Sequence, residues 1–380
     1  MTAAQWGGSE ELWSAAAAYA LSKGDEIIIS VYDQMSNAPQ IVELVNKGAH
    51  LHTRALFKNP ELIPPLIKRA FNFIKRKLIP PKPPAFSLQP ILDFQPDVLC
   101  INQGDTYAAA LDPEVIKLVA YNIPYVLISQ FNREISVFQD IQRIEQVKKF
   151  CLGANYFLFV SERNFQIAKR QLFNSMRNSR LIGNAPSLKH YDLITYPSPN
   201  ECYQMACVAR LEANIKGQDL LLEVLAQPHW KNRNWQLNLY GSGPSYQYLK
   251  CLAENLGIAH RVYFHGHVKD IKKIWQTNHI NILPSISEGT PLSLQEAMIC
   301  GRPSVVTDVG DNAKLVGYDQ ERGFIAEAPT LRYLSNAMEK AWESRNHWEQ
   351  MGIAAHQYIK EHINMYPEIE LYDYLCKSKK

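Results

Sequence analysis

Short apolar runs alternate with helical stretches along the whole chain. In the first half the apolar runs are Glu26–Val31, Asp97–Ile101, Tyr125–Ser129 and Tyr156–Ser161. In the second half they are Gln204–Ala209, Gln236–Tyr240, Val262–Phe264, Ile280–Leu283 and Ser304–Thr307. Helices are expected between them, including Glu10–Ser22 and Glu162–Leu172. Apolar strands that alternate with helices are typical of parallel sheets, so the pattern predicts an α/β architecture.

A linker-like segment divides this pattern into two halves. At 380 residues the chain is long enough for two domains, each with its own core. The best boundary is Tyr191–Asn200, which is rich in proline, serine and asparagine at its end. We predict one domain over residues 1–192 and a second over residues 200–355. The last residues, 356–380, are expected to form a helix that crosses back to the first domain.

The start of the chain departs from the expected pattern. The glycine pair Gly7–Gly8 precedes a helix, at the place where a strand–turn–helix phosphate loop should lie, but the strand before it is absent. Either the fold dispenses with this strand, or the given chain begins inside the first strand–helix unit. We expect a truncated or misassigned start.

Composition narrows the classes of protein that fit. The net charge of +3 is too small to indicate a nucleic-acid partner. The seven cysteines are odd in number and form no CxxC pair, which indicates reduced thiols in a reducing compartment. The sequence has no apolar stretch of about eighteen residues, and its N-terminus lacks a basic-then-apolar signal pattern. We therefore expect a cytoplasmic location.

Positive charge is concentrated between residues 47 and 90, where Glu61 is the single acid. Within this region, residues 61–78 place apolar side chains on one helical face and basic side chains around them. Such a helix can lie on the anionic inner face of a membrane, or hold a lipid-linked or otherwise anionic acceptor. The alternative is a helix packed on the first domain with a solvated basic side.

Two carboxylates mark the segment 280–310 as a candidate site. Glu288 lies in a loop after an apolar strand, and Glu296 lies eight positions later inside the following helix. Two acids beside a phosphate site would fit a ligand that also carries hydroxyl groups, as a nucleotide-sugar does. The alternative is that both are surface or helix-start acids, which are favoured near a helix N-terminus in any case.

The helix that carries Glu296 has a recognisable start and end. Thr290 is expected to be its N-cap and Pro291 its first residue, and Gly301 is expected to end it. The N–H groups of Gly289, Thr290 and Leu292 would then point at the turn with the positive end of the helix dipole. This arrangement predicts an anion site.

Arg210 and Lys216 form a second candidate constellation. Both follow a strand and precede an amphipathic helix that begins near Gln218. A guanidinium and an ammonium in one loop can neutralise a diphosphate, although two solvated surface charges would look the same. The glycine loop at Gly241–Pro244 follows another strand, but it lacks the third glycine of a dinucleotide signature and is a weak signal alone.

The order of these motifs resembles the retaining glycosyltransferases of family 4, the group 1 family. The resemblance rests on VARL and KG around Arg210 and Lys216, on YGSGP, on FHGHV, and on SEGTPLSLQEAM followed by GRPSVVTDVG. The E-x7-E motif of the family is matched by Glu288 and Glu296. The resemblance implies the GT-B architecture, in which two Rossmann-like parallel-sheet domains face each other across a cleft.

The resemblance also implies roles for individual residues. Arg210 and Lys216 would stabilise the departing diphosphate, as preorganised charges do in such reactions. Glu296 would hold the ribose, and Glu288 would contact the transferred sugar or assist its charge-rich transition state. The donor would be a nucleoside-diphosphate sugar bound by the second domain, and the acceptor would bind the first domain. No metal and no cofactor are implied.

Further positions are implied as parts of the substrate site. The glycine loop at Gly8 would lie beside the donor diphosphate, as in the family's GGxE pattern. The segment that contains Gly266 and Val268 would border the base, and the glycine loop at Gly241 would approach the ligand. Gln130 stands where the family often has a histidine near the acceptor. Because glutamine cannot act as a base, acceptor handling is expected to differ.

The predicted function is transfer of a hexosyl group, with retention, to a saccharide or lipid-linked acceptor in polysaccharide or cell-envelope glycan synthesis. Lys314, where the family has an acid, is a second departure from its pattern. Two alternatives stay open: a nucleotide-sugar epimerase on the same scaffold, and a degenerate homologue that only binds a glycan or a partner. The sequence does not specify the donor sugar, its base, the acceptor or the oligomeric state.

Overall fold

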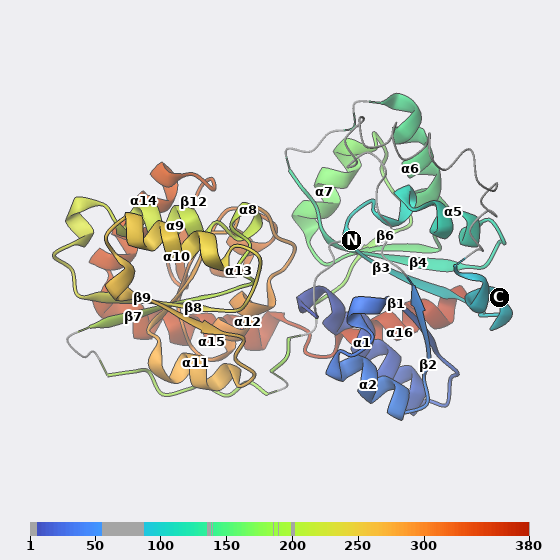
Figure 1. The fold of residues 1–380 in the computed structure, drawn as a ribbon, viewed down its shortest axis with the longest axis horizontal. Coiled ribbons are helices and arrows are strands. Elements are labelled where there is room, and N and C mark those ends of the chain that lie inside the picture. Colours follow the sequence, from blue (N-terminus) through green and yellow to red (C-terminus); the bar gives the residue numbers. More distant parts are fainter. Residues whose placement is uncertain are drawn as a thin grey trace, which may run out of the picture. The chain divides into compact units, whose positions relative to one another are not determined.

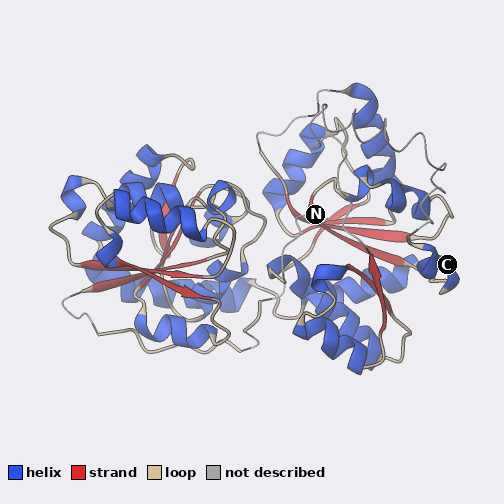
Figure 2. Cartoon of the chain, viewed as in Figure 1, coloured by secondary structure: helices blue, strands red, loops and turns tan. Residues whose placement is uncertain are grey.

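The computed structural model describes residues 6–54, 87–134, 138, 140–184, 186–188, 190–198 and 202–379. The described chain is a mixed α/β structure, in which helices cover strands (Figures 1 and 2). The chain forms two compact units: Met1–Ile128 with Asp140–Phe157 and Glu368–Lys380, and Ser129–Gln139 with Leu158–Pro367. The predicted basic helix at 61–78 lies outside the described residues.

The strands and longer helices of the N-terminal half are α1 (Gly8–Ser22), β1 (Ile28–Tyr32), α2 (Pro39–Asn46), β2 (His50–Arg54), α4 (Gln89–Asp93), β3 (Leu99–Asp105), α5 (Pro113–Val119), β4 (Tyr125–Phe131), α6 (Ile141–Gly153), β5 (Tyr156–Phe159), α7 (Glu162–Gln171) and β6 (Ser179–Leu181). Strands β1 and β2 pair in parallel, and β3, β4, β5 and β6 form a four-stranded sheet in that order. Buried Ile29 and Val31 of β1 pack with Ile41 and Leu44 of α2.

The elements of the C-terminal half are β7 (Tyr203–Val208), α8 (Ala213–Lys216), α9 (Gln218–Leu225), β8 (Trp235–Tyr240), α10 (Tyr246–Asn255), β9 (Val262–Gly266), α11 (Ile271–Thr277), β10 (Ile280–Leu283), α12 (Leu292–Ile299), β11 (Ser304–Thr307), α13 (Asn312–Val316), β12 (Gly323–Ala326), α14 (Leu331–Glu343), α15 (Trp348–His362) and α16 (Pro367–Ser378). Short 3-10 helices lie at Asp33–Met35, Ala109–Leu111, Pro228–Trp230, Ala259–Arg261 and Arg345–His347.

A six-stranded parallel sheet organises the second unit, in the order β12-β11-β10-β7-β8-β9. Helices α9, α10 and α14 cover one face, and α11, α12 and α15 cover the other (Figure 1). Every residue of β10 and β11 is buried. Strands buried on both faces favour apolar side chains at successive positions, and the polar side chains here are small: Asn281 of β10, and Ser304 and Thr307 of β11.

Each predicted strand is present, and β10 and β11 have the predicted ends. Three further strands were not predicted: β2, β6 and β12. Strand β2 reads His-Leu-His-Thr-Arg and is largely exposed, so it lacks the apolar run that marks a buried strand. Strands β6 and β12 have three and four residues, too few to show a pattern.

The single helix expected over residues 356–380 is instead the end of α15 and a separate helix, α16, which groups with the first unit from Glu368 on. There the Tyr372 hydroxyl donates to Asp25 at 2.7 Å, and the Tyr372 ring contacts Tyr19 edge-on. Residues 158–192, which the sequence assigns to the first domain, fall in the second compact unit. The domain limits inferred from the sequence stay predictions.

All seven cysteines are free thiols, and Cys151, Cys207 and Cys300 are buried. Burial raises the pKa of the Cys207 and Cys300 thiols to about 12. Such thiols are inert core residues, in keeping with the expected reduced state. Within the part of the chain that the structure describes, no helix is both long enough and apolar enough to cross a membrane.

Arg302 is completely buried in the second unit, and its guanidinium donates only to backbone carbonyl oxygens in the hydrogen bonds described. The acceptors belong to Ile194, Thr195, Trp275, Asn278, Cys300 and Gly301. Burial lowers the pKa of Arg302. The side chain therefore joins the linker at 194–195 to the end of α12 and to the loop after α11.

We predict that Arg302→Met lowers the free energy of unfolding by about 3 kcal/mol, because several buried carbonyl oxygens lose their donors. Urea unfolding followed by fluorescence measures the change. The matched control is Arg332→Met on the exposed side of α14, which should change stability by less than about 0.5 kcal/mol. Equal stabilities of the two variants would contradict the assigned role of Arg302.

Candidate functional site

The candidate site lies where the six-stranded sheet changes its direction of winding. The chain enters at β7, adds β8 and β9 on one side, and then returns to add β10, β11 and β12 on the other. Strands β7 and β10 are therefore neighbours, with Ile280 opposite Met205 and Asn281 opposite Ala206. In open α/β sheets, ligands bind at the carboxyl ends of the strands at such a switch point. The loops after β7 and β10 both begin there.

The two loops are in direct contact. The Ile286 N–H donates to the carbonyl oxygen of Ile215 at 2.8 Å. Gly217, which follows α8, has a φ of +62°, and a Cβ atom there would lie 2.1 Å from the Pro284 carbonyl oxygen. Only glycine allows both this backbone conformation and this close approach. The contact brings the end of α8 next to the loop that carries Glu288.

Lys216 and Glu288 form an ion pair across this contact. The Lys216 Nζ atom lies 2.5 Å from Glu288 Oε1, and the Ser285 hydroxyl donates to the same oxygen at 2.7 Å. The Glu288 side chain is 7% exposed and the Lys216 side chain 22%. The sequence predicts both residues in one site, but it does not predict that they pair directly.

Arg210 does not join this pair. Its Nε atom lies 3.5 Å from Glu212 Oε2, and its side chain is 36% exposed. Its carbonyl oxygen accepts a hydrogen bond of 2.8 Å from the Gln218 side chain, which fixes the loop backbone at the start of α9. The Arg210 guanidinium therefore lies in the same loop as Lys216, but it pairs with Glu212 rather than with Glu288.

Glu296 lies inside α12 and is buried, with 6% of its surface exposed. The Ser187 hydroxyl donates to its Oε1 atom. A buried carboxylate needs such donors, because an unpaired charge loses its hydration. The alternative, in which Glu288 and Glu296 are surface acids, is therefore wrong, because both side chains are buried.

The predicted start of α12 needs a correction by one residue. The helix begins at Leu292 with Pro291 as its N-cap, and no side chain caps it. The Thr290 hydroxyl donates instead to the Val160 carbonyl oxygen, so Thr290 ties the loop to a neighbouring segment. Gly301 follows the helix end with a φ of +74°, as predicted.

The anion site expected at this turn has free backbone donors. The N–H groups of Gly289, Thr290 and Leu292 have no hydrogen-bond acceptor among the described residues. Helix α12 follows directly, so its dipole adds to the positive potential of these groups. Such a turn favours a negatively charged ligand.

Other predicted site residues lie in several places. In the second unit, the Gly241 N–H donates to the Gly266 carbonyl oxygen at 2.7 Å, which joins the ends of β8 and β9. Val268 packs against the cluster that contains Tyr240. Gln130 follows Ser129 at the end of β4, and a Cβ atom at Gly289 would lie 2.1 Å from its carbonyl oxygen. Gly8 is the first residue of α1, in the first unit.

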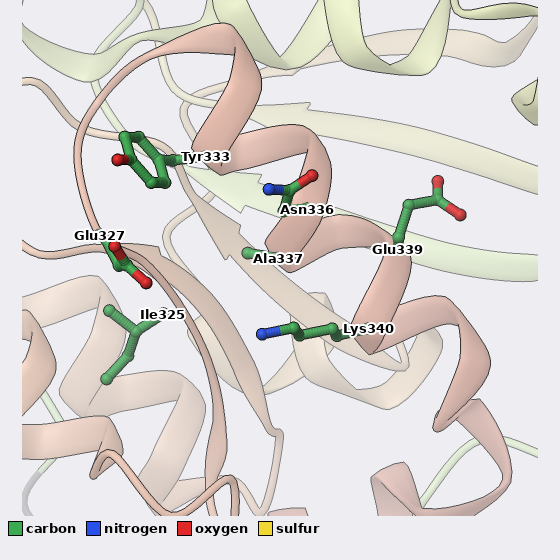
Figure 3. Close-up of a pocket in the computed structure, with 7 residues that line it drawn as sticks. All are labelled: Ile325, Glu327, Tyr333, Asn336, Ala337, Glu339 and Lys340. Atoms are coloured by element: carbon green, nitrogen blue, oxygen red, sulfur yellow. The ribbon is translucent and has the colours of Figure 1, made fainter.

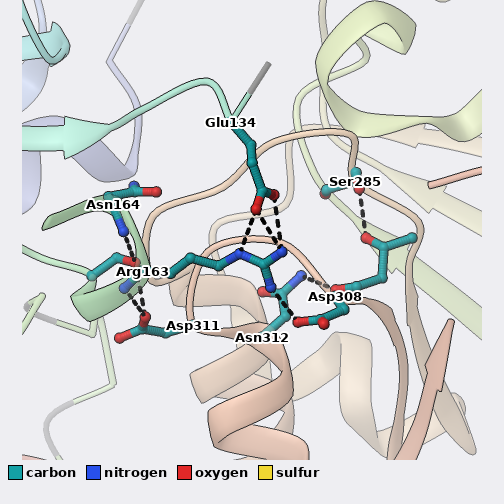
Figure 4. Close-up of polar contacts among 9 residues, drawn as sticks. Glu134, Arg163, Asn164, Ser285, Asp308, Asp311 and Asn312 are labelled. Atoms are coloured by element: carbon teal, nitrogen blue, oxygen red, sulfur yellow. Dashed lines mark hydrogen bonds and ion pairs between the residues drawn. The ribbon is translucent and has the colours of Figure 1, made fainter. Parts of the chain in front are cut away.

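A charged network that the sequence does not predict lies beside the Glu288 loop. Arg163 of α7 contacts the carboxylates of Glu134 and Asp308 (Figure 4). Asp311, which precedes α13, accepts hydrogen bonds from the backbone at the start of α7. It therefore caps a different helix from the one it precedes, and local sequence carries no signal for that.

A cavity of about 290 Å³ lies elsewhere in the second unit, between β12 and α14 (Figure 3). Its lining residues are Ile325, Glu327, Tyr333, Asn336, Ala337, Glu339 and Lys340. No predicted site residue is among them. Strand β12 is the edge of the sheet, so this cavity is separated from the switch point by β11 and β10.

In the described part of the chain, no group of three or more His, Cys, Asp or Glu side chains is placed so that it could hold a metal ion. Independence from metal stays a prediction from the sequence.

The Lys216–Glu288 pair gives a prediction about stability. Lys216→Met should lower the free energy of unfolding by about 2 kcal/mol, because it leaves a buried carboxylate without its cation. A double-mutant cycle with Glu288→Gln should show a coupling energy above about 1 kcal/mol. The exposed pair Lys47–Glu43 is the control and should couple by less than about 0.5 kcal/mol. Equal coupling in the two pairs would contradict a buried ion pair.

The chain is similar to known proteins over part of its length. Residues 195–358 match the family model described as glycosyl transferases group 1. An uncharacterized glycosyltransferase of Haemophilus influenzae is 29% identical over 161 residues, which are 40% of this chain and 46% of that protein. The lipopolysaccharide core biosynthesis mannosyltransferase LpsB of Rhizobium meliloti is 29% identical over 147 residues, 37% of this chain and 42% of that protein. The chain thus spans less than half the length of these curated relatives.

Solved structures resemble the chain over nearly its whole length. The crystal structure of HepE from Anabaena in complex with UDP has a TM-score of 0.69 and covers 98% of this chain and 96% of its own, at 17% sequence identity. HepE has also been solved with UDP-glucose, with a TM-score of 0.68. This likeness confirms the predicted α/β fold class, GT-B. Residues 195–358, which carry Arg210, Lys216, Glu288 and Glu296, are thus similar to the group 1 glycosyltransferases.

Proposed function

We propose that this chain transfers a hexosyl group, with retention of configuration, from a nucleoside-diphosphate sugar to a saccharide or lipid-linked acceptor. The observation that carries the proposal is the meeting of two loops at the carboxyl ends of β7 and β10. One loop supplies Arg210 and Lys216, and the other supplies Glu288 and the free N–H groups before α12. Cations, N–H donors and buried carboxylates at one edge of a sheet suit a ligand with both phosphates and hydroxyls.

In this proposal, Lys216 and Arg210 stabilise the negative charge that develops on the departing diphosphate. Preorganised charges act strongly on a transition state because they need no rearrangement when the charge appears. An ammonium has three donors, of which Glu288 takes one. The remaining donors of Lys216 are available to phosphate oxygens. Arg210, one third exposed, can turn from Glu212 to the ligand.

Glu288 is proposed to act on the sugar. Its ion pair with Lys216 and its hydrogen bond from Ser285 hold the carboxylate in place through Oε1. A carboxylate held in this way can accept hydrogen bonds from sugar hydroxyls and stabilise positive charge at the reacting carbon. Its second oxygen, Oε2, takes no part in either of these contacts.

Glu296 is proposed to hold the ribose of the donor. The two oxygens of a carboxylate can accept both hydroxyls of a ribose. In the ligand-free structure the Ser187 hydroxyl donates to Oε1. A ribose hydroxyl would take over this donation, so the hydrogen bond of the buried carboxylate is exchanged rather than lost.

The donor and the setting are proposed from the relatives. HepE has been solved with UDP and with UDP-glucose, which makes UDP-glucose the first donor to test. LpsB acts in lipopolysaccharide core biosynthesis, which supports a role in cell-envelope glycan synthesis. We place the protein on the cytoplasmic side, where nucleotide-sugars are made. Contact with a membrane through residues 61–78, the place of Gly8 beside the donor diphosphate, and the acceptor role of Gln130 stay predictions.

We predict that Glu288→Gln, Arg210→Met and Lys216→Met each lower the transfer rate by about 100-fold or more, the scale of lost transition-state electrostatics. Turnover of UDP-glucose, as transfer or as slow hydrolysis, measures the effect. The control is Glu327→Gln in the cavity of Figure 3, an exposed acid far along the sheet, which should leave turnover unchanged.

Two outcomes would favour other functions. A free sugar isomer formed without any acceptor would favour an epimerase. Tight binding of UDP with no turnover of any nucleotide-sugar would favour a degenerate binding protein. Near-normal turnover in all three variants would contradict the proposed roles of these residues.

A further inference from the structure

The loop that carries Glu288 is held at four consecutive residues by segments far away in the sequence. The Ser287 hydroxyl donates to the Asn132 carbonyl oxygen at 2.9 Å, and the Asn164 side chain donates to the Glu288 carbonyl oxygen at 3.0 Å. The carbonyl oxygen of Gly289 accepts from the N–H of Asp311 at 3.0 Å. The Thr290 hydroxyl donates to the carbonyl oxygen of Val160.

At Gly289 and Gly310 the neighbouring backbone is so close that there is no room for a side chain. A Cβ atom at Gly310 would lie 2.2 Å from the Gly289 carbonyl oxygen and 2.7 Å from that of Glu288. A Cβ atom at Gly289 would collide with the Gln130 carbonyl oxygen. The Glu288 loop therefore contacts two sets of residues, which we call layers: residues 130–132 with 160–164, and residues 310–311.

One guanidinium joins these two layers. Arg163 Nη1 donates to Asp308 Oδ1 at 2.6 Å, and Arg163 Nη2 donates to both oxygens of Glu134 at 2.9 Å (Figure 4). Arg163 Nε adds a bond of 3.2 Å to Glu134. Figure 4 shows the guanidinium between the two carboxylates, with one on either side of it. Although burial opposes it, these hydrogen bonds raise the pKa of Arg163.

Asp311 strengthens the same junction. Its Oδ1 atom accepts from the Ser161 hydroxyl at 2.8 Å and from the Arg163 N–H at 3.4 Å. Its Oδ2 atom accepts from the Glu162 N–H at 3.3 Å, so the carboxylate lies at the positive end of α7. Lys314, the departure noted in the sequence, forms an ion pair of 2.9 Å with Glu162. Ion pairs and hydrogen bonds to carboxylates thus connect the start of α7 to the segment 308–314 at several points.

We propose that Arg163 is a positioning residue for sugar transfer. This inference rests on the function proposed above. By holding Asp308 and Glu134 together, it fixes the two layers that grip the Glu288 loop. Arg163 touches none of the residues assigned to the donor diphosphate. Its loss should therefore affect the position of the Glu288 carboxylate more than the binding of UDP, to which Arg210 and Lys216 contribute from another loop.

The test uses Arg163→Met and Arg163→Lys in the full chain, with Arg332→Met as a control that removes an exposed positive charge. Displacement of a catalytic group by about 1 Å can cost about 100-fold in rate. We expect kcat for UDP-glucose turnover to fall by about that factor in Arg163→Met, while the Kd of UDP rises by a much smaller factor. Arg163→Lys should recover only part of kcat, because an ammonium cannot form the forked contact with two carboxylates.

A second readout does not depend on activity. Hydrogen exchange in the peptide that spans residues 285–294 should become faster in Arg163→Met and stay unchanged in Arg332→Met. UDP binding by the variants shows that they are folded. Unchanged exchange and unchanged kcat in Arg163→Met would overturn the proposal, as would an equal loss of kcat and of UDP affinity. A wild-type protein that turns over no nucleotide-sugar would refute the proposed function itself, and exchange would still show whether Arg163 fixes the loop.

Discussion

The ion pair between Lys216 and Glu288 is the interaction on which the proposed chemistry depends. It joins the loops that leave β7 and β10, and these strands are neighbours only because the chain winds outward in one direction and then returns. Adding a charge pair to a largely dry site is costly unless both partners are well placed. Here Gly217 allows the two backbones to approach each other, and the Ser285 hydroxyl donates a hydrogen bond to the same carboxylate oxygen as Lys216.

Much of the fold could be predicted from the sequence because the strands of the second unit are buried. β10 reads Ile-Asn-Ile-Leu and β11 reads Ser-Val-Val-Thr, and short runs rich in β-branched residues are typical of buried strands. Strand β2 could not be found in this way, since it carries two histidines and an arginine and is mostly exposed. Thr290 was assigned to the wrong role because a local cap and a long-range hydrogen bond need the same hydroxyl.

The candidate site was readable in its residue types but not in its pairings. Arg210, Lys216, Glu288 and Glu296 stand out by spacing and by the family resemblance. That Lys216 contacts Glu288 while Arg210 contacts Glu212 depends on side-chain geometry across two loops. Arg163, Asp308 and Asp311 gave no signal, because their partners lie about 30 to 150 positions away. Long-range contacts of this kind are set by topology, which one sequence does not reveal.

These observations describe a site supported from several directions. Arg302 fixes the linker against the end of α12, and the network around Arg163 fixes the loop before it. Both ends of the segment that holds Glu288 and Glu296 are thereby restrained. Functional groups need such support, because a loose side chain spends little time in a reactive position.

The most direct test of the donor site is a crystal structure of the chain with bound UDP. The account predicts that the diphosphate lies within hydrogen-bond distance of Lys216 Nζ and of the N–H groups before α12, with the ribose on Glu296. A diphosphate bound elsewhere, for example in the cavity between β12 and α14, would contradict it.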